Sequence, residues 1–191
     1  MKFRDNYFAI NHKIHDLVAN VDIDKLYNIS KEIIRIKENK KKLIIVGNGG
    51  SHAIAEHIST DISRTLSLPA LSFSSTSLNT CFANDYEYQN AVSKYIQNFS
   101  NSGDLIILIS SSGESENMIN GANTAKKLNL KLVTLTGFEI DNRLSSLGDI
   151  NIQIPIKHYN IVENSHQIIL TTILDIINQN IIPMDLNYPK K

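Results

Sequence analysis

The spacing of apolar residues changes along this chain, and the change separates two kinds of segment. Between Phe8 and about Asn39 the apolar residues recur three or four positions apart, which is the period of an amphipathic helix. We therefore expect N-terminal helices within about residues 5–39, and Asp22 or Asp24 is suited to cap the second of them. Further along, the apolar residues come in short runs of Ile, Leu and Val, which are typical of strands buried on both faces.

Five such runs alternate with segments that have a helical pattern. The runs are 43–47, 68–73, 104–110, 131–136 and 150–155, and the helical segments are 51–66, 86–99, 115–128 and 160–181. Strands that alternate with helices predict an α/β fold, with a doubly wound, five-stranded parallel sheet flanked by helices. We expect a single domain over residues 1–191, with an αβα core at about 42–182 and a short C-terminal tail, "PMDLNYPKK".

Composition narrows the cellular setting and the classes of partner. Lys and Arg together number 19, as do Asp and Glu, which argues against a nucleic-acid-binding surface spread over the whole protein. Cys81 is the single cysteine, so the chain has no internal disulfide, and a reducing cytoplasm is the natural setting. There is no apolar signal-peptide core and no apolar run long enough for a membrane span. We expect a cytoplasmic protein with no nucleic-acid or membrane partner.

The predicted sheet indicates where a ligand would bind. In open parallel sheets, ligands bind beyond the carboxyl ends of the strands, where loops lead into helices. In this chain those loops are "GNGGSH" after the first strand, "SFSSTSLNT" after the second and "SSSGESEN" after the third.

The loop "GNGGSH" spans Gly47 to His52 and spends three glycines on four neighbouring positions. It lacks the third glycine of the dinucleotide fingerprint and the Gly-Lys-Ser/Thr of a P-loop, so we expect no nucleotide cofactor. Two interpretations remain for it. The loop is either a tight strand-to-helix turn without a ligand, or a bare backbone at a helix N-terminus that an anion approaches.

The loop "SSSGES" favours the second interpretation. Ser110, Ser111, Ser112 and Ser115 crowd the start of a helix, after a strand, as the glycines do. Hydroxyls and helix N–H groups can surround a phosphate without any lysine. The alternative is a serine-rich helix cap, but a cap needs one serine or two, and this loop has four. The paired loops therefore predict a phosphate site.

Two pairs of titratable residues share helix faces. His57 and Asp61 are four apart, and Glu163 and His166 are three apart. Together they are suited to hold a divalent metal or to act as an acid/base cluster, although such pairs are also common as plain surface contacts. The segment "NDYEY", Asn84 to Tyr88, is a polar break that is either a ligand-facing loop or a cap.

The two loops together resemble those of the sugar isomerase (SIS) fold. Within that group the chain is most similar to the phosphoheptose isomerases, through "GNGGSHAIAEH", "ANDYEY", "SSSGESENMI", "LVTLTG" and "IPIKHYNIVENSH". The resemblance covers about residues 10–182. It implies isomerisation between sedoheptulose 7-phosphate and a manno-heptose 7-phosphate, an aldose–ketose reaction that supplies heptose for surface polysaccharide and lipopolysaccharide. It also implies a homotetramer whose active sites lie between subunits.

The resemblance also implies roles for individual residues. The four serines of "SSSGES" would hold the sugar phosphate, and Asn84 and Asp85 would contact the sugar. The wall of the site would be lined by Asn48, Gly49, Gly50 and Ser51. A metal, usually zinc in the family, would be held by His57, Asp61, Glu163 and the residue at Thr171.

Three of the four implied metal positions depart from the family pattern. Asp61 stands where the family has glutamate, Glu163 where it has glutamine and Thr171 where it has histidine. Isomerisation needs a base and an acid, and we expect Asp61 or Glu163 to be the base and His166 to be the partner acid. Two alternatives stay open: a phosphosugar-binding or regulatory protein, for example one that binds the replication initiator, or an isomerase of another sugar phosphate.

Overall fold

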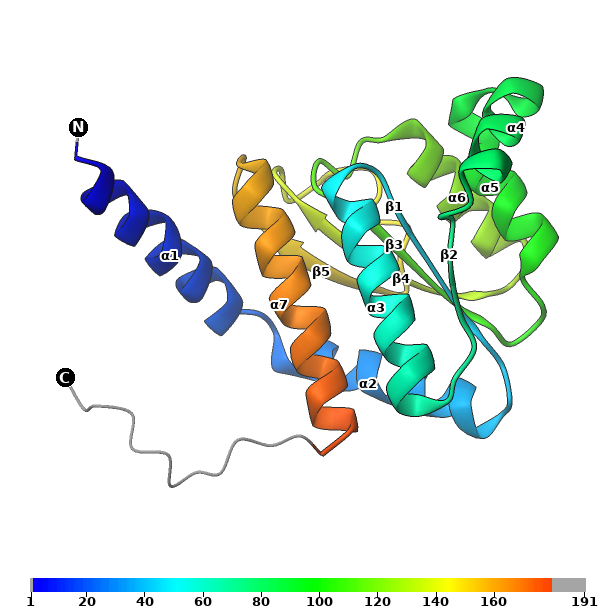
Figure 1. Ribbon diagram of the computed structural model, residues 1–191, viewed down its shortest axis with the longest axis horizontal. Helices are drawn as coiled ribbons and strands as arrows, with labels where there is room; N and C mark the ends of the chain where they lie inside the picture. Colours follow the sequence, from blue (N-terminus) through cyan, green and yellow to red (C-terminus); the bar gives the residue numbers. More distant parts are fainter. Residues whose placement is uncertain (1, 180–191) are drawn as a thin grey trace.

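The computed structural model describes residues 2–179, in which strands and helices alternate after two N-terminal helices (Figure 1). The helices are α1 (Phe3–Ala19), α2 (Ile23–Glu38), α3 (Gly50–Leu66), α4 (Thr76–Tyr86), α5 (Tyr88–Phe99), α6 (Glu116–Lys127) and α7 (Tyr159–Ile177). The strands are β1 (Leu43–Gly47), β2 (Ala70–Ser72), β3 (Leu105–Ser110), β4 (Lys131–Gly137) and β5 (Ile150–Ile154). The predicted tail "PMDLNYPKK" lies outside the described residues.

The five strands form one parallel sheet in the order β2-β1-β3-β4-β5. The predicted α/β fold with a doubly wound parallel sheet is therefore confirmed. The chain builds outward from β1 in both directions, so the order of the strands reverses between β1 and β3. A reversal of this kind opens a crevice at the carboxyl ends of the two strands, and both candidate loops follow these strands.

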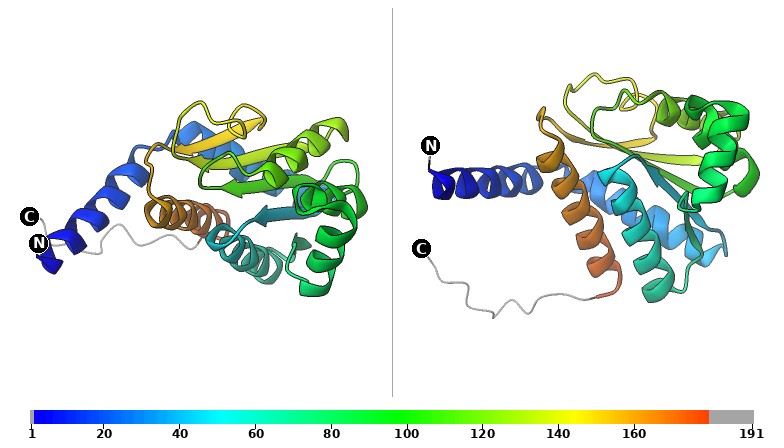
Figure 2. Two further views of the ribbon diagram at one scale, coloured as in Figure 1. Left: turned by 90° about the horizontal axis from the view of Figure 1, so that it is seen from above. Right: turned by 45° about the horizontal axis from the view of Figure 1, so that its top comes forward.

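Alternate side chains of the central strands enter two separate cores. Leu43 and Ile45 of β1 pack in one core with α2, α3 and α7, whereas Ile44 and Val46 pack in the other with α4, α5 and α6. Every residue of β1 and β3 is buried, because helices cover both faces of the sheet (Figures 1 and 2). This double burial explains why these strands are uninterrupted apolar runs instead of alternating apolar and polar residues.

The N-terminal region forms the predicted helices, but only the second belongs to the body of the protein. Asp22 caps α2, since its Oδ1 accepts hydrogen bonds from the backbone N–H groups of Asp24 and Lys25. α1 has no buried residue and projects away from the sheet, with only its last turns against the body (Figures 1 and 2). None of the helices within residues 2–179 has the length and apolarity needed to cross a membrane.

The segment after β2 differs from the prediction. We expected "SFSSTSLNT" to be a loop, but its second half begins α4, which Ser75 caps by accepting a hydrogen bond from the Leu78 N–H. Glu87 then separates α4 from α5, with a φ of 65° that interrupts the helix. The polar break predicted at "NDYEY" is therefore a single-residue kink between two helices.

Candidate active site

A cavity of about 270 Å³ opens at the carboxyl ends of β1 and β3, between the two candidate loops. Its walls come from the loop after β1, the loop after β3 and the first turns of α7. The lining residues are Asn48, Gly49, Gly50, Ser51, Ile109, Ser110, Ser111, Ser112, Ser115, Tyr159 and Glu163. The structure thus brings together the residues of both loops that the sequence singled out, and adds Glu163 to them.

The glycines of the first loop allow the chain to turn sharply and leave the backbone bare. Gly49 has a φ of 54°, a conformation that residues with a Cβ rarely adopt, and α3 begins at the next residue. A Cβ on Gly47 would lie 2.5 Å from the carbonyl carbon of Ser51, so this position requires glycine for packing. The turn is tight, and it also exposes the start of α3 to the cavity.

Glu163 lies directly against the bare backbone of Gly50. A Cβ built on Gly50 would be 2.5 Å from Glu163 Cδ and 2.7 Å from Oε1. Partial burial raises the pKa of the Glu163 carboxyl above its ordinary value, and the neighbouring Ser111 partly offsets this by favouring the charged form. A carboxyl whose pKa is shifted toward neutrality suits proton transfer at neutral pH.

The serines of the second loop keep part of their hydrogen-bonding capacity free. Ser115 is the N-cap residue of α6, yet its side chain makes no capping hydrogen bond. The hydroxyl of Ser111 is buried and makes no hydrogen bond of ordinary geometry within the described residues, although it lies near enough to the Glu163 carboxylate to favour its charged form. Ser112 Oγ accepts a hydrogen bond from the Glu114 N–H, and Ser110 Oγ accepts one from the Gly113 N–H. The capping interpretation therefore does not account for four serines, and free donors face the cavity at a helix N-terminus.

The loop after β4 holds the serine loop in place. The Leu144 N–H donates to the carbonyl of Gly113, and the Arg143 N–H donates to the Glu114 carboxylate. Asn142 is buried and donates to the carbonyls of Gly137 and Glu139, which fixes its own loop. The serine loop is thus held against residues of the loop after β4 as well as by its own turn.

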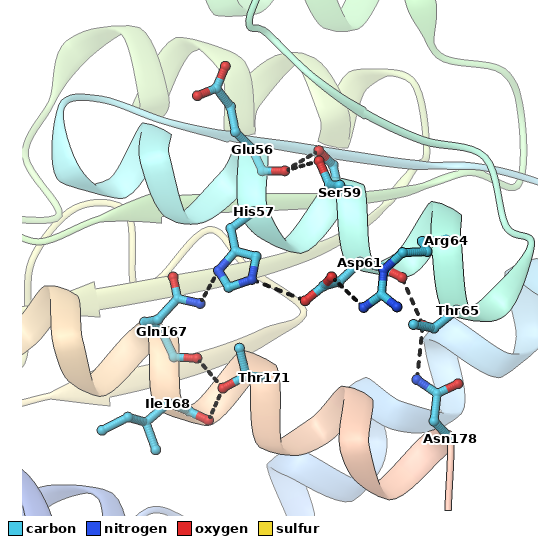
Figure 3. Close-up of polar contacts among 11 residues, drawn as sticks. Glu56, His57, Ser59, Asp61, Arg64, Thr65, Gln167, Ile168, Thr171 and Asn178 are labelled. Atoms are coloured by element: carbon cyan, nitrogen blue, oxygen red, sulfur yellow. Dashed lines mark hydrogen bonds and ion pairs between the residues drawn. The ribbon is translucent and has the colours of Figure 1, made fainter. Parts of the chain in front are cut away.

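His57 and Asp61 lie on α3, outside the cavity lining, in a network of polar contacts with α7 (Figure 3). His57 Nε2 is 3.1 Å from Asp61 Oδ2, and His57 Nδ1 is 2.9 Å from Gln167 Nε2. The other oxygen of Asp61 pairs with Arg64 at 3.0 Å. Both ring nitrogens of His57 and both oxygens of Asp61 are therefore engaged with side chains of this chain.

The predicted metal ligands are not assembled into a metal site. Within residues 2–179 no group of three or more His, Cys, Asp or Glu side chains is arranged to hold a metal ion. Glu163 lies against Gly50, and the hydroxyl of Thr171 donates to main-chain carbonyls of its own helix. A zinc site needs three or four ligands, so His57 and Asp61 alone do not fit the zinc ion that the family resemblance implies.

His166 is not placed beside Glu163 as an acid partner. The side chain is fully buried, its Nε2 is 3.1 Å from the carbonyl oxygen of Thr136 in β4, and its Nδ1 has no partner among the described residues. Burial lowers the pKa of His166 to about 4, so the imidazole is neutral at physiological pH. Three residues along a helix rotate by less than a full turn, which directs His166 toward the sheet and Glu163 toward the cavity.

Asn84 and Asp85 also lie outside the cavity lining, at the exposed end of α4. The amide of Asn84 donates to Asp85 Oδ1 at 2.9 Å, and this hydrogen bond, followed by one from Cys81, lowers the pKa of Asp85. The structure therefore does not bring these two residues together with the phosphate loops. Sequence reasoning missed Tyr159, which lines the cavity from the start of α7, because a lone tyrosine carries no motif.

The comparisons with known proteins agree with the fold and the loops. The family model described as SIS domain matches residues 6–137. The phosphoheptose isomerase of Sulfurimonas denitrificans is 33% identical over 165 residues, which cover 83% of this chain and 84% of that protein. The phosphoheptose isomerase of Buchnera aphidicola is 36% identical over 142 residues, which cover 70% and 73% of the two chains.

Two solved structures are similar over almost the whole chain. The phosphoheptose isomerase of Francisella tularensis superposes with a TM-score of 0.84 at 26% identity and covers 94% of this chain and 100% of that one. The phosphoheptose isomerase of Neisseria gonorrhoeae has a TM-score of 0.85 at 23% identity, with 92% and 96% covered. This chain therefore belongs to the SIS domain family, and within it to the phosphoheptose isomerases.

Proposed function

We propose that the protein isomerises sedoheptulose 7-phosphate to a manno-heptose 7-phosphate in the cavity between β1 and β3. The observation that carries the proposal is the convergence of a serine-rich helix N-terminus and the Glu163 carboxyl on one cavity. The first supplies donors for a phosphate, and the second supplies a group that moves protons. The family membership supports the substrate class, because relatives along most of this chain are named phosphoheptose isomerases.

The phosphate is proposed to bind at the serine loop. The unpartnered hydroxyl of Ser111 and the uncapped start of α6 at Ser115 both offer donors there. None of the described lining residues is Lys or Arg, so hydroxyls and the positive end of the helix dipole must supply the attraction. Asn48 to Ser51 form the neighbouring wall, where the bare backbone lets the sugar approach closely.

Glu163 is the better placed of the two carboxylates that we expected to act as the base. It lines the cavity and has a raised pKa, whereas Asp61 lies outside the lining and pairs with His57 and Arg64. A base in the cavity would take the proton from the carbon next to the carbonyl, and the resulting enediol would be reprotonated at the neighbouring carbon. No step is assigned to a metal, because the donor set does not fit one.

The proposal includes a homotetramer in the cytoplasm that supplies heptose for surface polysaccharide. The exposed aromatic surface of α1 supports assembly: Phe3 is 85% exposed and Tyr7 56% exposed, on a helix with no buried residue. Exposed aromatic side chains of this kind are unfavourable in a monomer and supply a contact area in an oligomer. Light scattering tests the tetramer, and a monomeric mass at working concentration would contradict it.

The test of the function is turnover of sedoheptulose 7-phosphate followed by NMR, for the parent protein and two variants. Glu163→Gln keeps the shape of the side chain and removes the base, so kcat should fall by about 10²–10⁴-fold. Glu56→Gln, on the exposed side of α3, is the matched control and should retain parent activity. Parent-like turnover by Glu163→Gln would contradict the role of Glu163. Saturable binding without turnover by the parent would instead indicate a phosphosugar-binding protein.

A further inference from the structure

The side chain of Asn48 in the first loop is held by two residues from helices on the other side of the sheet. Its Nδ2 donates to Asn117 Oδ1 at 3.0 Å, and Asn117 Nδ2 donates back to Asn48 Oδ1 at 2.9 Å. The hydroxyl of Tyr88 donates to the same Asn48 Oδ1 at 3.0 Å. Asn117 is buried in the first turn of α6, so this pair of amides joins the glycine loop directly to the helix that follows the serine loop.

The orientation of both amides is determined by a main-chain donor. The Met118 N–H donates to the Ser115 carbonyl at 3.0 Å and also to Asn117 Oδ1 at 3.1 Å, and a backbone N–H can only donate. The Asn117 oxygen is therefore on that side, and its NH₂ group must face Asn48 Oδ1. Asn48 Oδ1 then accepts hydrogen bonds from both Asn117 and Tyr88. These two hydrogen bonds also fix the orientation of the Asn48 NH₂ group.

One N–H donor of the Asn48 side chain is not used by the hydrogen bonds described above. The side chain has two N–H donors, of which Asn117 takes one, and the second has no partner among the described residues. Asn48 lines the cavity beside Glu163 and the serines. An amide N–H held in this way is a preorganised donor, which costs nothing to orient when a substrate oxygen arrives.

We propose that Asn117 is a positioning residue, assisted by Tyr88, that fixes the amide of Asn48 so that its remaining N–H donates to an oxygen of the bound sugar. The proposal rests on the proposed function of this cavity. Neither residue lines the cavity, so both act through Asn48. The pair also ties the glycine loop to the first turn of the helix that follows the serine loop, and a sugar phosphate would have to span these two loops.

The direct test is Asn117→Asp, which keeps the oxygen that accepts from Met118 and replaces the donor that faces Asn48 Oδ1 by a carboxylate oxygen. Two acceptors then face each other, and the Asn48 amide must rotate or withdraw. Misplacement by about 1 Å costs on the order of a hundredfold, so kcat/KM should fall by about 10–100-fold. Asn123→Asp is the matched control, because Asn123 is an exposed residue further along the same helix. It should stay within about twofold of the parent.

A double-mutant cycle separates positioning from general support of the fold. In an Asn48→Ala background, Asn117→Asp should change kcat/KM by less than about twofold, because the side chain through which it acts is gone. Additive losses in the two backgrounds would overturn the proposal. Tyr88→Phe removes only a hydroxyl, and in the same cycle it should cause a smaller loss of kcat/KM. This second variant keeps the test valid if Asn117→Asp fails to fold.

Calorimetric binding of sedoheptulose 7-phosphate by the same variants distinguishes failure of this proposal from failure of the proposed function. A parent that binds without turnover refutes the isomerase, while loss of affinity in Asn117→Asp that disappears in the Asn48→Ala background still supports positioning. A parent that neither binds nor turns over this sugar phosphate overturns both.

Discussion

Adding one methyl group at Gly50 should reduce the activity of the protein without reducing its stability. A Cβ there would lie 2.5 Å from Glu163 Cδ, and ordinary contact begins at 3.4 Å, so the carboxyl must withdraw by about 1 Å. A displacement of that size costs on the order of a hundredfold in kcat/KM when it moves a reacting group. Gly50 is the first residue of α3 and does not have a positive φ, so alanine fits the backbone. Replacing glycine by alanine where the backbone allows it stabilises a protein by about 0.4–1 kcal/mol, chiefly by restricting the unfolded chain, so the Tm should not fall.

The assay for Gly50→Ala is turnover of sedoheptulose 7-phosphate together with urea unfolding of the same preparation. The control is the same substitution in a Glu163→Ala background, where the methyl group has no carboxyl to displace. There the loss in kcat/KM should be clearly smaller, because the methyl group then only narrows the wall that the sugar approaches. The reasoning would be refuted by a variant that keeps activity within about threefold of the parent, or by equal losses in both backgrounds.

Three other perturbations test separate parts of the structure. Gly113→Ala should lower the free energy of unfolding in urea by about 2–4 kcal/mol, because Gly113 has a φ of 69° and a Cβ there would lie 2.7 Å from Asn142 Cβ. An unchanged unfolding midpoint would contradict this prediction. Burial lowers the pKa of His166 to about 4 from 6.5, so the folded state should be fully stable above pH 6.5 and lose up to about 3 kcal/mol as the pH falls to 4. In His166→Gln the free energy of unfolding should vary less with pH between 7.5 and 4.5. An unaltered pH dependence would show that other groups cause it. Dialysis against EDTA should leave kcat/KM and Tm unchanged, because residues 2–179 assemble no set of three metal ligands; stoichiometric zinc by elemental analysis would contradict this.

The fold was predictable because β1 and β3, at the centre of the sheet, are buried on both faces, so their apolar runs are unbroken and a helical period resumes after each. α4 is the exception, and its physical reason is plain. Phe82 is the only buried residue in that helix, so the segment has almost no apolar face from which a period can be read. Its start, "SSTSLN", consists mainly of residues that favour turns as much as caps, and Ser75 is in fact a cap.

The two loops of the site were predictable from topology, whereas the direction of individual side chains was not. Parallel strands end at one edge, so loops after β1 and β3 must meet there. Glu163 and His166 are three residues apart on one helix, yet the first reaches Gly50 and the second reaches the Thr136 carbonyl. That difference is set by which neighbours fill the space beside each, and spacing along the helix does not contain this information. Asn117 was missed for the same reason, since its partner is 69 positions away.

The helix α1 projects from the body of the protein, so whether it stays helical depends on the surface that contacts it. Within residues 2–179 only the last turns of this 17-residue helix pack against the core, and a helical segment without tertiary packing is marginal in water. Phe3, Tyr7 and Phe8 lie in the first half of α1 and are 85%, 56% and 46% exposed, so residues 2–179 leave much of each ring uncovered. Whatever surface covers these aromatic rings also supplies the free energy that keeps the helix formed. Circular dichroism of a dilution series should therefore show a loss of helix signal as the assembly dissociates.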